Sequence, residues 1–231
     1  RLPKDRQTLF FSATMPNAVS GLAGDILRDP ERVSVTPAST PVERIEQSVI
    51  FLSAGQKADR LAEILRDPAL DRTIVFTRTK HRADRVARHL AQAGIESAAI
   101  HGNKSQNVRQ RTLKGFRDGR VRVLVATDIA ARGIDIDGVS HIINFELPNV
   151  PEDYVHRIGR TARAGASGTA IAFCDPEEQA YLSAIEALTR HKLRIAGGEP
   201  ARAAPSAKKP ARGPQRRRRR RPGIQGQRHA A

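Results

Sequence analysis

Three basic side chains at helical spacing are the part of this sequence best suited to bind phosphate. Residues 156–163 read HRIGRTAR. On a helix of about 100° per residue, His156, Arg160 and Arg163 project from one side, if the helix continues that far. A guanidinium offers phosphoryl oxygens a fixed fork of donors, so two arginines aimed at one point predict a polyphosphate clamp. The alternative for this stretch alone is a solvated basic helix face.

A second stretch joins a buried strand to small residues and carboxylates. Residues 125–135 read VATDIAARGID, so Thr127, Asp128, Gly133 and Asp135 follow an apolar run. Small residues let backbone amides approach a phosphate or a sugar closely. The alternative is an ordinary strand–helix loop in which Asp128 caps the helix.

Shorter fragments gain meaning only from their positions. Residues 12–14 (SAT) directly follow an apolar run, and Arg78 stands at the end of another. Gln106 and Arg109 are one turn apart at the start of a predicted helix. Alone, each fragment indicates no more than polar residues at the protein surface.

One stretch is similar to a nucleotide-binding loop without being one. Residues 102–105 (GNKS) follow a predicted strand and open a helix, but no Gly-Lys pair and no Asp-Glu-Ala-Asp occur in the chain. Several histidines show no metal-ligand spacing, so the sequence predicts no metal site. These are His81, His89, His101, His141 and His191.

Alternating strands and helices must position these side chains. Short runs rich in Val and Ile predict buried parallel strands at residues 48–52, 73–77, 97–100, 121–127, 141–145 and 169–173. Helical patterns are predicted at residues 57–66, 80–93, 105–118, 151–160 and 176–189, with Asn149 as a cap for the fourth. The pattern predicts an α/β fold with a parallel sheet covered on both faces, and ligands on such sheets lie beyond the carboxyl ends of the strands.

Composition divides the 231 residues unevenly. Residues 1–36, with a strand candidate at 8–12 and a helix at 16–27, are interpreted as the end of a preceding domain. Residues 37–44 form a linker, 45–196 a domain, and 197–231 a disordered tail. From Ala201 the tail holds eleven Lys and Arg and no acidic residue, out of a net charge of +16, which favours a nucleic-acid backbone as its partner.

Other classes are disfavoured by what the sequence lacks. The single cysteine, Cys174, excludes an internal disulfide and fits a reducing cytoplasm. No apolar run approaches the roughly 18 residues that a membrane span needs. Because the chain opens with Arg1 in the style of mid-protein sequence, we expect it to be a fragment of a longer protein.

In this order the motifs resemble the second RecA-like domain of DEAD-box ATP-dependent RNA helicases. Residues 12–14 match motif III, 74–79 motif IV, 106–109 the Q-x-x-R element, 126–135 motif V and 156–163 motif VI. The resemblance covers residues 8 to about 189. Residues 100–106 and the basic tail look most like the bacterial RhlE-type branch. Ala162 stands where many members carry glycine.

The resemblance implies a role for each matched residue. Arg160 and Arg163 would contact the ATP phosphates, with Arg163 the arginine finger. Asp135 and the Gly133 backbone would meet the ATP ribose. His156 would couple the domains, together with Ser12 and Thr14 of motif III. Three residues would hold the RNA sugar-phosphate backbone: Arg78, Arg109 and Thr127.

The same resemblance implies what lies outside this chain. The cofactor would be ATP with Mg²⁺, and the phosphate-binding loop and the Mg²⁺ ligands are expected in an N-terminal RecA-like domain of the same polypeptide. The chain alone is therefore expected to lack ATPase activity, and the parent to act in the bacterial cytoplasm. Two alternatives stay open: a non-catalytic RNA-binding module whose tail is the working part, and a DNA-directed helicase of the same superfamily.

Overall fold

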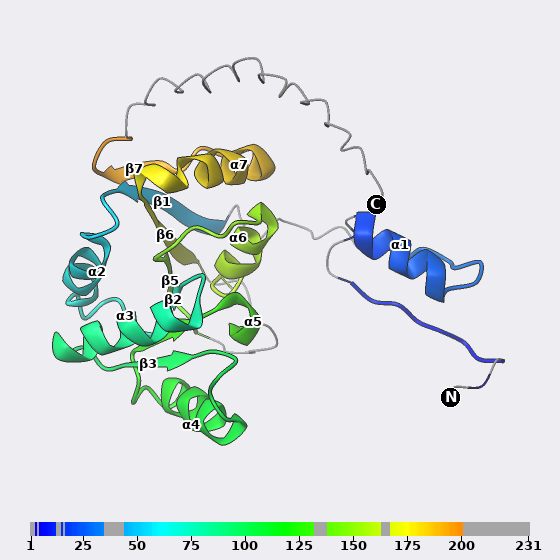
Figure 1. The fold of residues 1–231 in the computed structure, drawn as a ribbon, viewed down its shortest axis with the longest axis horizontal. Coiled ribbons are helices and arrows are strands. Elements are labelled where there is room, and N and C mark those ends of the chain that lie inside the picture. Colours follow the sequence, from blue (N-terminus) through cyan, green and yellow to red (C-terminus); the bar gives the residue numbers. More distant parts are fainter. Residues whose placement is uncertain are drawn as a thin grey trace, which may run out of the picture.

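A parallel β-sheet with helices on both faces forms the body of the molecule (Figure 1). The computed structural model describes residues 3, 5–12, 15, 17–34, 44–131, 138–162 and 167–200. Within this part the sheet has seven strands in the order β3-β4-β2-β5-β6-β1-β7, and every neighbouring pair is parallel. The strands are β1 (Ile45–Phe51), β2 (Thr73–Phe76), β3 (Ser97–Ile100), β4 (Val123–Ala126), β5 (His141–Asn144), β6 (Gly168–Cys174) and β7 (Arg194–Gly197).

The two faces of the sheet have separate hydrophobic cores. Along β2, Ile74 and Phe76 pack into one core and Val75 into the other, because successive side chains of a strand point to opposite faces. This double burial is the reason that the strands read as unbroken apolar runs.

Helices from different parts of the chain cover the two cores. One face carries α2 (Lys57–Leu65) and α3 (Lys80–Gln92). The other carries α4 (Gln106–Arg117), α5 (Asp128–Ala131), α6 (Pro151–Ile158) and α7 (Gln179–Thr189), the last preceded by the 3₁₀ turn η3 (Pro176–Glu178). Figure 1 shows α2 and α3 on one side of the strands and α5 and α6 on the other. The predicted α/β fold with a parallel sheet is confirmed.

The N-terminal part differs from the prediction in one respect. Helix α1 (Asn17–Ile26) confirms the helix predicted at residues 16–27. The strand predicted at residues 8–12 is wrong, because these residues are extended but pair with no described strand. An apolar run becomes a strand only where a neighbouring strand accepts its hydrogen bonds.

Strand β7 was absent from the prediction. It pairs with β1 at the end of the sheet, and three of its four residues are exposed. An exposed edge strand needs no apolar run, so periodicity carries little signal for it. Disorder was predicted for residues 197–231, and this is wrong for Gly197, which closes β7. Residues 201–231 lie outside the described residues.

Helix α6 begins at Pro151, as predicted, and ends two residues before the end that the sequence pattern indicated. It ends at Ile158 with Gly159 as its C-cap, so Arg160 lies in the turn that follows. The N-cap is Val150, and it makes no side-chain cap hydrogen bond. The predicted cap, Asn149, is wrong, because its Oδ1 instead accepts a hydrogen bond from Arg78 at 3.2 Å.

Candidate functional site

Most of the predicted site residues that the structure describes follow the carboxyl ends of neighbouring strands. Because the strands are parallel, the loops after β2, β4 and β5 emerge at one edge of the sheet. The helix after β2 packs on one face, whereas those after β4 and β5 pack on the other. Chain segments that diverge in this way leave a crevice at the edge, which is where such sheets bind ligands.

A buried arginine joins the elements on the α5–α6 side of this edge. The Arg157 side chain is 1% exposed and forms a bidentate pair with Asp128, Nε to Oδ1 at 2.6 Å and Nη2 to Oδ2 at 2.8 Å. Its Nη1 donates to Asn144 Oδ1 at 3.0 Å and to the Glu146 carbonyl at 2.7 Å. The guanidinium carbon lies 5.1 Å from the centre of the Phe76 ring. Arg157 therefore fixes α6 against α5 and the end of β5.

A shallow hollow opens beside this arginine. It is lined by Phe76, Asp128, Ala131, His156, Arg157 and Arg160. The His156 side chain is 40% exposed, and its Nδ1 lies 3.8 Å from Asp153 Oδ1. Arg160 is half-buried. The structure thus brings His156 and Arg160 to one hollow, and Arg163 lies outside the described residues.

The turn after α6 contains a conformation that favours glycine. Ala162 has a φ of +55°, in the left-handed region. For a residue with a Cβ atom this conformation costs about 1–2 kcal/mol. The backbone conformation therefore explains why glycine suits this position.

Two of the predicted RNA contacts lie together at the ends of β3 and β4. The Thr127 amide donates to the Ile100 carbonyl at 3.4 Å, and its own carbonyl accepts from the Ala131 amide. Arg109 reaches across from α4 to the Ala130 carbonyl at 3.5 Å. Its Nε is buried without a hydrogen-bond partner among the described residues. A buried donor in this state is costly.

Four further residues of the predicted site are Gly133, Asp135, Ser12 and Thr14. Gly133 and Asp135, expected at the ATP ribose, and Thr14 lie outside the described residues. Ser12 is exposed in the extended segment before α1, and Figure 1 draws that segment apart from the sheet.

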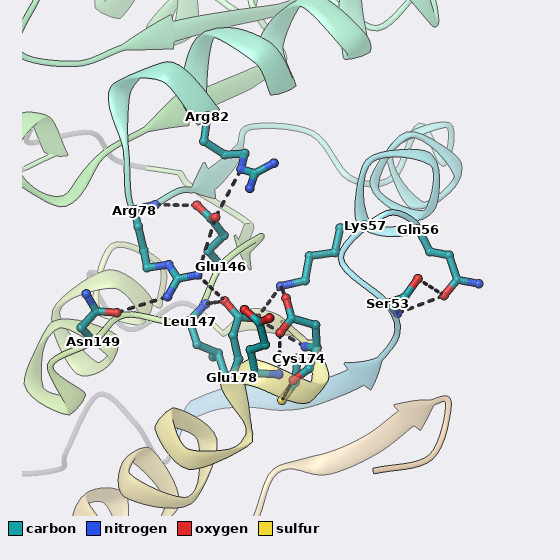
Figure 2. A network of polar contacts seen from close by, with 12 residues as sticks. Ser53, Gln56, Lys57, Arg78, Arg82, Glu146, Leu147, Asn149, Cys174 and Glu178 are labelled. Carbon is teal, nitrogen blue, oxygen red and sulfur yellow. Dashed lines mark hydrogen bonds and ion pairs between the residues drawn. The ribbon is translucent and has the colours of Figure 1, made fainter. Parts of the chain in front are cut away.

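Arg78, the third predicted RNA contact, lies in a cluster of charges (Figure 2). Its Nη2 is 3.4 Å from Glu178 Oε1 and 3.8 Å from Glu146 Oε1, and its backbone amide donates to Glu146 Oε2 at 2.9 Å. The guanidinium carbon lies 5.7 Å from the centre of the Tyr181 ring, and 31% of the side chain remains exposed. Arg82 Nε adds a second ion pair to Glu146 at 3.3 Å.

Glu178 is the most deeply buried carboxylate of this cluster. Its side chain is 1% exposed, forms an ion pair with Lys57 and accepts from the Leu147 amide at 3.2 Å. Lys57 Nζ also lies 2.9 Å from Asp175 Oδ2. Burial raises the pKa of Glu178 above 4.5, and the positive charge of Lys57 opposes that shift. The nearby thiol of Cys174 is also buried, which raises its pKa to about 12.

A smaller charged group ties α3 to the loop after β3. His101 is buried, and its Nε2 lies 3.0 Å from Asp84 Oδ2, while Lys104 Nζ lies 2.9 Å from Asp84 Oδ1. Burial acts to raise the pKa of Asp84, but His101 and Lys104 outweigh it, and the net shift is downward from 3.8.

Arg157, Glu146, Glu178 and Lys57 were missed as functional candidates by the sequence analysis. Only Arg157 had a usable signal: it is three residues after Tyr154 and one before Ile158, on the apolar side of the helix, where a charge must have partners. The other three stand outside the matched motifs, and their partners come from distant parts of the chain.

Comparison with known proteins gives consistent matches over this region. The family model described as "Helicase conserved C-terminal domain" matches residues 56–165. The DEAD-box ATP-dependent RNA helicase CshA of Bacillus subtilis is 43% identical over 192 residues, covering 83% of this chain and 39% of that protein. The ATP-dependent RNA helicase RhlB of Pseudomonas syringae is 42% identical over 189 residues, covering 82% and 48%. The chain spans less than half the length of these curated relatives.

Solved structures match the same fold. The Escherichia coli DEAD-box protein SrmB, bound to the regulator of ribonuclease activity A, is 38% identical with a TM-score of 0.65, covering 70% of this chain and 98% of that one. Saccharomyces cerevisiae Dbp5 bound to RNA and ADP BeF₃ is 34% identical with a TM-score of 0.76, covering 85% and 52%. Separately, none of the helices in the described part combines the length and the apolarity required to cross a bilayer.

Proposed function

We propose that this chain forms one wall of a site that couples ATP hydrolysis to the separation of RNA duplexes. The chain belongs to the DEAD-box helicase family and carries its C-terminal helicase domain. The observation that carries the proposal is the convergence of two groups of hydrogen-bonding side chains at one sheet edge. His156 and Arg160 line the hollow beside α5, and Arg109 and Thr127 stand at the ends of β3 and β4.

The residues around the hollow fit an anionic nucleotide. Arg157 donates hydrogen bonds to Asp128, Asn144 and Glu146, so its guanidinium is used in contacts within the domain. Arg160 and His156 line the hollow and are partly exposed, and phosphoryl oxygens require donors in fixed positions. ATP, when bound with Mg²⁺, supplies the phosphoryl group that water attacks. Arg160, with Arg163, would stabilise the negative charge that develops during that transfer.

Further parts of the ATP site are proposals for other segments. Asp135 and the Gly133 backbone would hold the ribose. The ligands of Mg²⁺ and the phosphate-binding loop are proposed to lie in an N-terminal RecA-like domain of the same polypeptide, with Ser12, Thr14 and His156 coupling the two domains.

The proposed RNA contacts follow the sugar-phosphate backbone. Arg109 has a buried Nε that finds no acceptor among the described residues, and Thr127 at the end of β4 is half-buried. Arg78 keeps part of its guanidinium exposed despite its carboxylate neighbours. Contacts of this type position a strand without reading its sequence. RNA recognition in this domain would therefore be independent of base identity.

A steady-state ATPase assay with RNA and Mg²⁺ tests the division of labour. We expect no turnover by the 231-residue chain alone. In a protein that joins it to its preceding domain, Arg163→Ala or Arg160→Ala should lower the ATPase rate by at least about tenfold while RNA affinity is largely retained. Arg109→Ala should do the reverse, with the rate recovered at high RNA. Loss of less than tenfold for both arginines would refute the clamp.

The finer assignments are also proposals. Residues 100–106 and the basic tail support an RhlE-like branch, whereas the curated relatives described above bear the names CshA and RhlB. Action in the bacterial cytoplasm is supported by the bacterial sources of those relatives. A parent protein that binds RNA but shows no ATPase activity would favour the alternative of a non-catalytic RNA-binding module.

A further inference from the structure

A second crevice at the same edge of the sheet is closed by side chains. Strands β1 and β6 are neighbours, but the helix after β1 packs on one face and the helix after β6 on the other. Ligand sites in open parallel sheets form where following elements diverge in this way. Here Lys57 of α2 and the two carboxylates Asp175 and Glu178 occupy the position. The crevice is therefore filled from within by a buried ion-pair cluster.

Burying these charges costs free energy unless the ion-pair cluster stabilises the fold or supports the site. Replacing a buried ion pair by apolar residues of similar volume is often neutral or stabilising. The Lys57 side chain is 3% exposed and that of Glu178 is 1% exposed, so both charges are removed from water. Lys57 alone already has Asp175 as a partner at 2.9 Å. Glu178 therefore supplies something beyond neutralising Lys57.

The contacts of Glu178 show what that is. Its two carboxylate oxygens have different partners. Oε2 meets Lys57 and the Asp175 amide, and Oε1 meets the Leu147 amide and Arg78. Figure 2 shows this carboxylate between Lys57 on one side and Arg78 on the other. Lys57 thus anchors one oxygen while the other faces the guanidinium.

We propose that Glu178 is a positioning residue that orients the Arg78 guanidinium for RNA, and that Lys57 holds Glu178 in place. The inference rests on the proposed function, in which Arg78 contacts the RNA backbone. Glu178 Oε1 at 3.4 Å, Asn149 Oδ1 at 3.2 Å and the Tyr181 ring restrain the guanidinium from several sides. An arginine fixed in advance loses less rotamer freedom when it binds phosphate.

A double-mutant cycle in the full chain tests the coupling. Affinity for a fluorescent single-stranded RNA is measured by anisotropy for the original chain, Arg78→Ala, Glu178→Gln and the double variant. We expect dissociation constants to rise about tenfold for Arg78→Ala and about threefold for Glu178→Gln. The double variant should bind no more weakly than Arg78→Ala, since without Arg78 there is nothing to orient. The basic tail is present in every variant and cancels.

A matched control separates positioning from general support. Glu186 of α7 is 12% exposed, pairs with Lys192 and accepts from the Leu193 amide, but no contact joins it to Arg78 in the described structure. Glu186→Gln should leave RNA affinity unchanged. If Glu178→Gln does not fold, judged by circular dichroism, Glu178→Asp retains the charge, withdraws it from Arg78, and should give the same coupling.

Several outcomes would overturn the inference. An equal loss from Glu178→Gln with and without Arg78 would show a purely structural role. Tighter binding by Glu178→Gln would show that the carboxylate competes with phosphate. An equal loss from Glu186→Gln would show a nonspecific effect. Unchanged affinity of Arg78→Ala would refute the Arg78 contact itself, and the positioning role with it, while leaving Arg109, Thr127 and the ATP clamp to their own tests.

Discussion

Replacing Arg157 should destabilise the domain more than any exposed charge does. The guanidinium makes four hydrogen bonds, two of them to the Asp128 carboxylate, and is 1% exposed. Removing one partner of a buried ion pair costs about 3–5 kcal/mol, because the other charge is left without compensation. Arg157→Ala should therefore lower the free energy of unfolding by that amount. For a domain of about 150 residues this corresponds to a fall in Tm of roughly 10 °C.

A conservative variant of Arg157 tests whether the geometry or the charge matters. Arg157→Lys keeps the positive charge, but an ammonium group cannot hold Asp128 in a bidentate pair and also reach Asn144 and the Glu146 carbonyl. About half of the alanine penalty should remain, roughly 1.5–2.5 kcal/mol. This variant also remains informative if Arg157→Ala fails to fold.

Urea denaturation followed by far-ultraviolet circular dichroism measures both effects, because the chain contains no tryptophan for fluorescence. The control is Arg60→Ala, since Arg60 pairs with Glu63 at 2.7 Å with side chains that are 38% and 61% exposed. Its penalty should stay below about 1 kcal/mol. If Arg157→Ala were as mild as Arg60→Ala, the assignment of Arg157 as the link between α5 and α6 would be refuted.

Three further predictions concern the backbone, the pH dependence and the tail. Ala162→Gly should stabilise the domain by about 0.5–1 kcal/mol, since glycine accepts the left-handed φ of +55° without a Cβ penalty, and a lower Tm would contradict this. The pKa of Asp84 is lowered from 3.8 in the folded state, so its ionised form adds stability above pH 3.8 that is lost as the pH falls through the lowered pKa. Asp84→Asn should accordingly destabilise the protein more in urea titrations near pH 6 than near pH 2.5, whereas an equal penalty at both would argue against the ionic contacts. Ending the chain after Gly198 removes eleven positive charges, and if about five of them engage RNA, the slope of log K against log salt should flatten by roughly 3.5. Equal affinities and slopes for both lengths would show that the tail is no RNA tether.

The sequence was most informative where burial acts on both faces of a segment. The strands at the centre of the sheet were predictable because Ile74, Val75 and Phe76 are all apolar, each for one of two cores. Strand β7 and residues 8–12 show the limit of that signal. One is a strand with exposed side chains, and the other is an apolar run without a strand to pair with.

The candidate site divides along a similar line. Helical spacing grouped His156 with Arg160, and both line one hollow although Arg160 lies in the turn after α6. The neighbours of Arg78 could not be predicted in this way. Glu146 and Glu178 follow it by 68 and 100 positions, and only the order of the strands in the sheet brings them close to it. Local sequence patterns carry no information about such pairings.

The position of β1 also has a consequence for how the protein is made. Strand β1 pairs with β6 and β7, so Ile45 cannot pair until Gly168 has been synthesised. The last partner, β7, ends at Gly197. Strands β2 to β5 pair with one another and are able to assemble while the later residues are still being synthesised. During that interval β1 has no partner, and Lys57 is without Glu178. Pairings between distant segments form late in folding because loop closure precedes their gain. The contacts of Glu178 with Lys57 and Arg78 therefore form after β2 to β5 can pair, and a ribosome stalled before residue 168 would present Arg78 without Glu178.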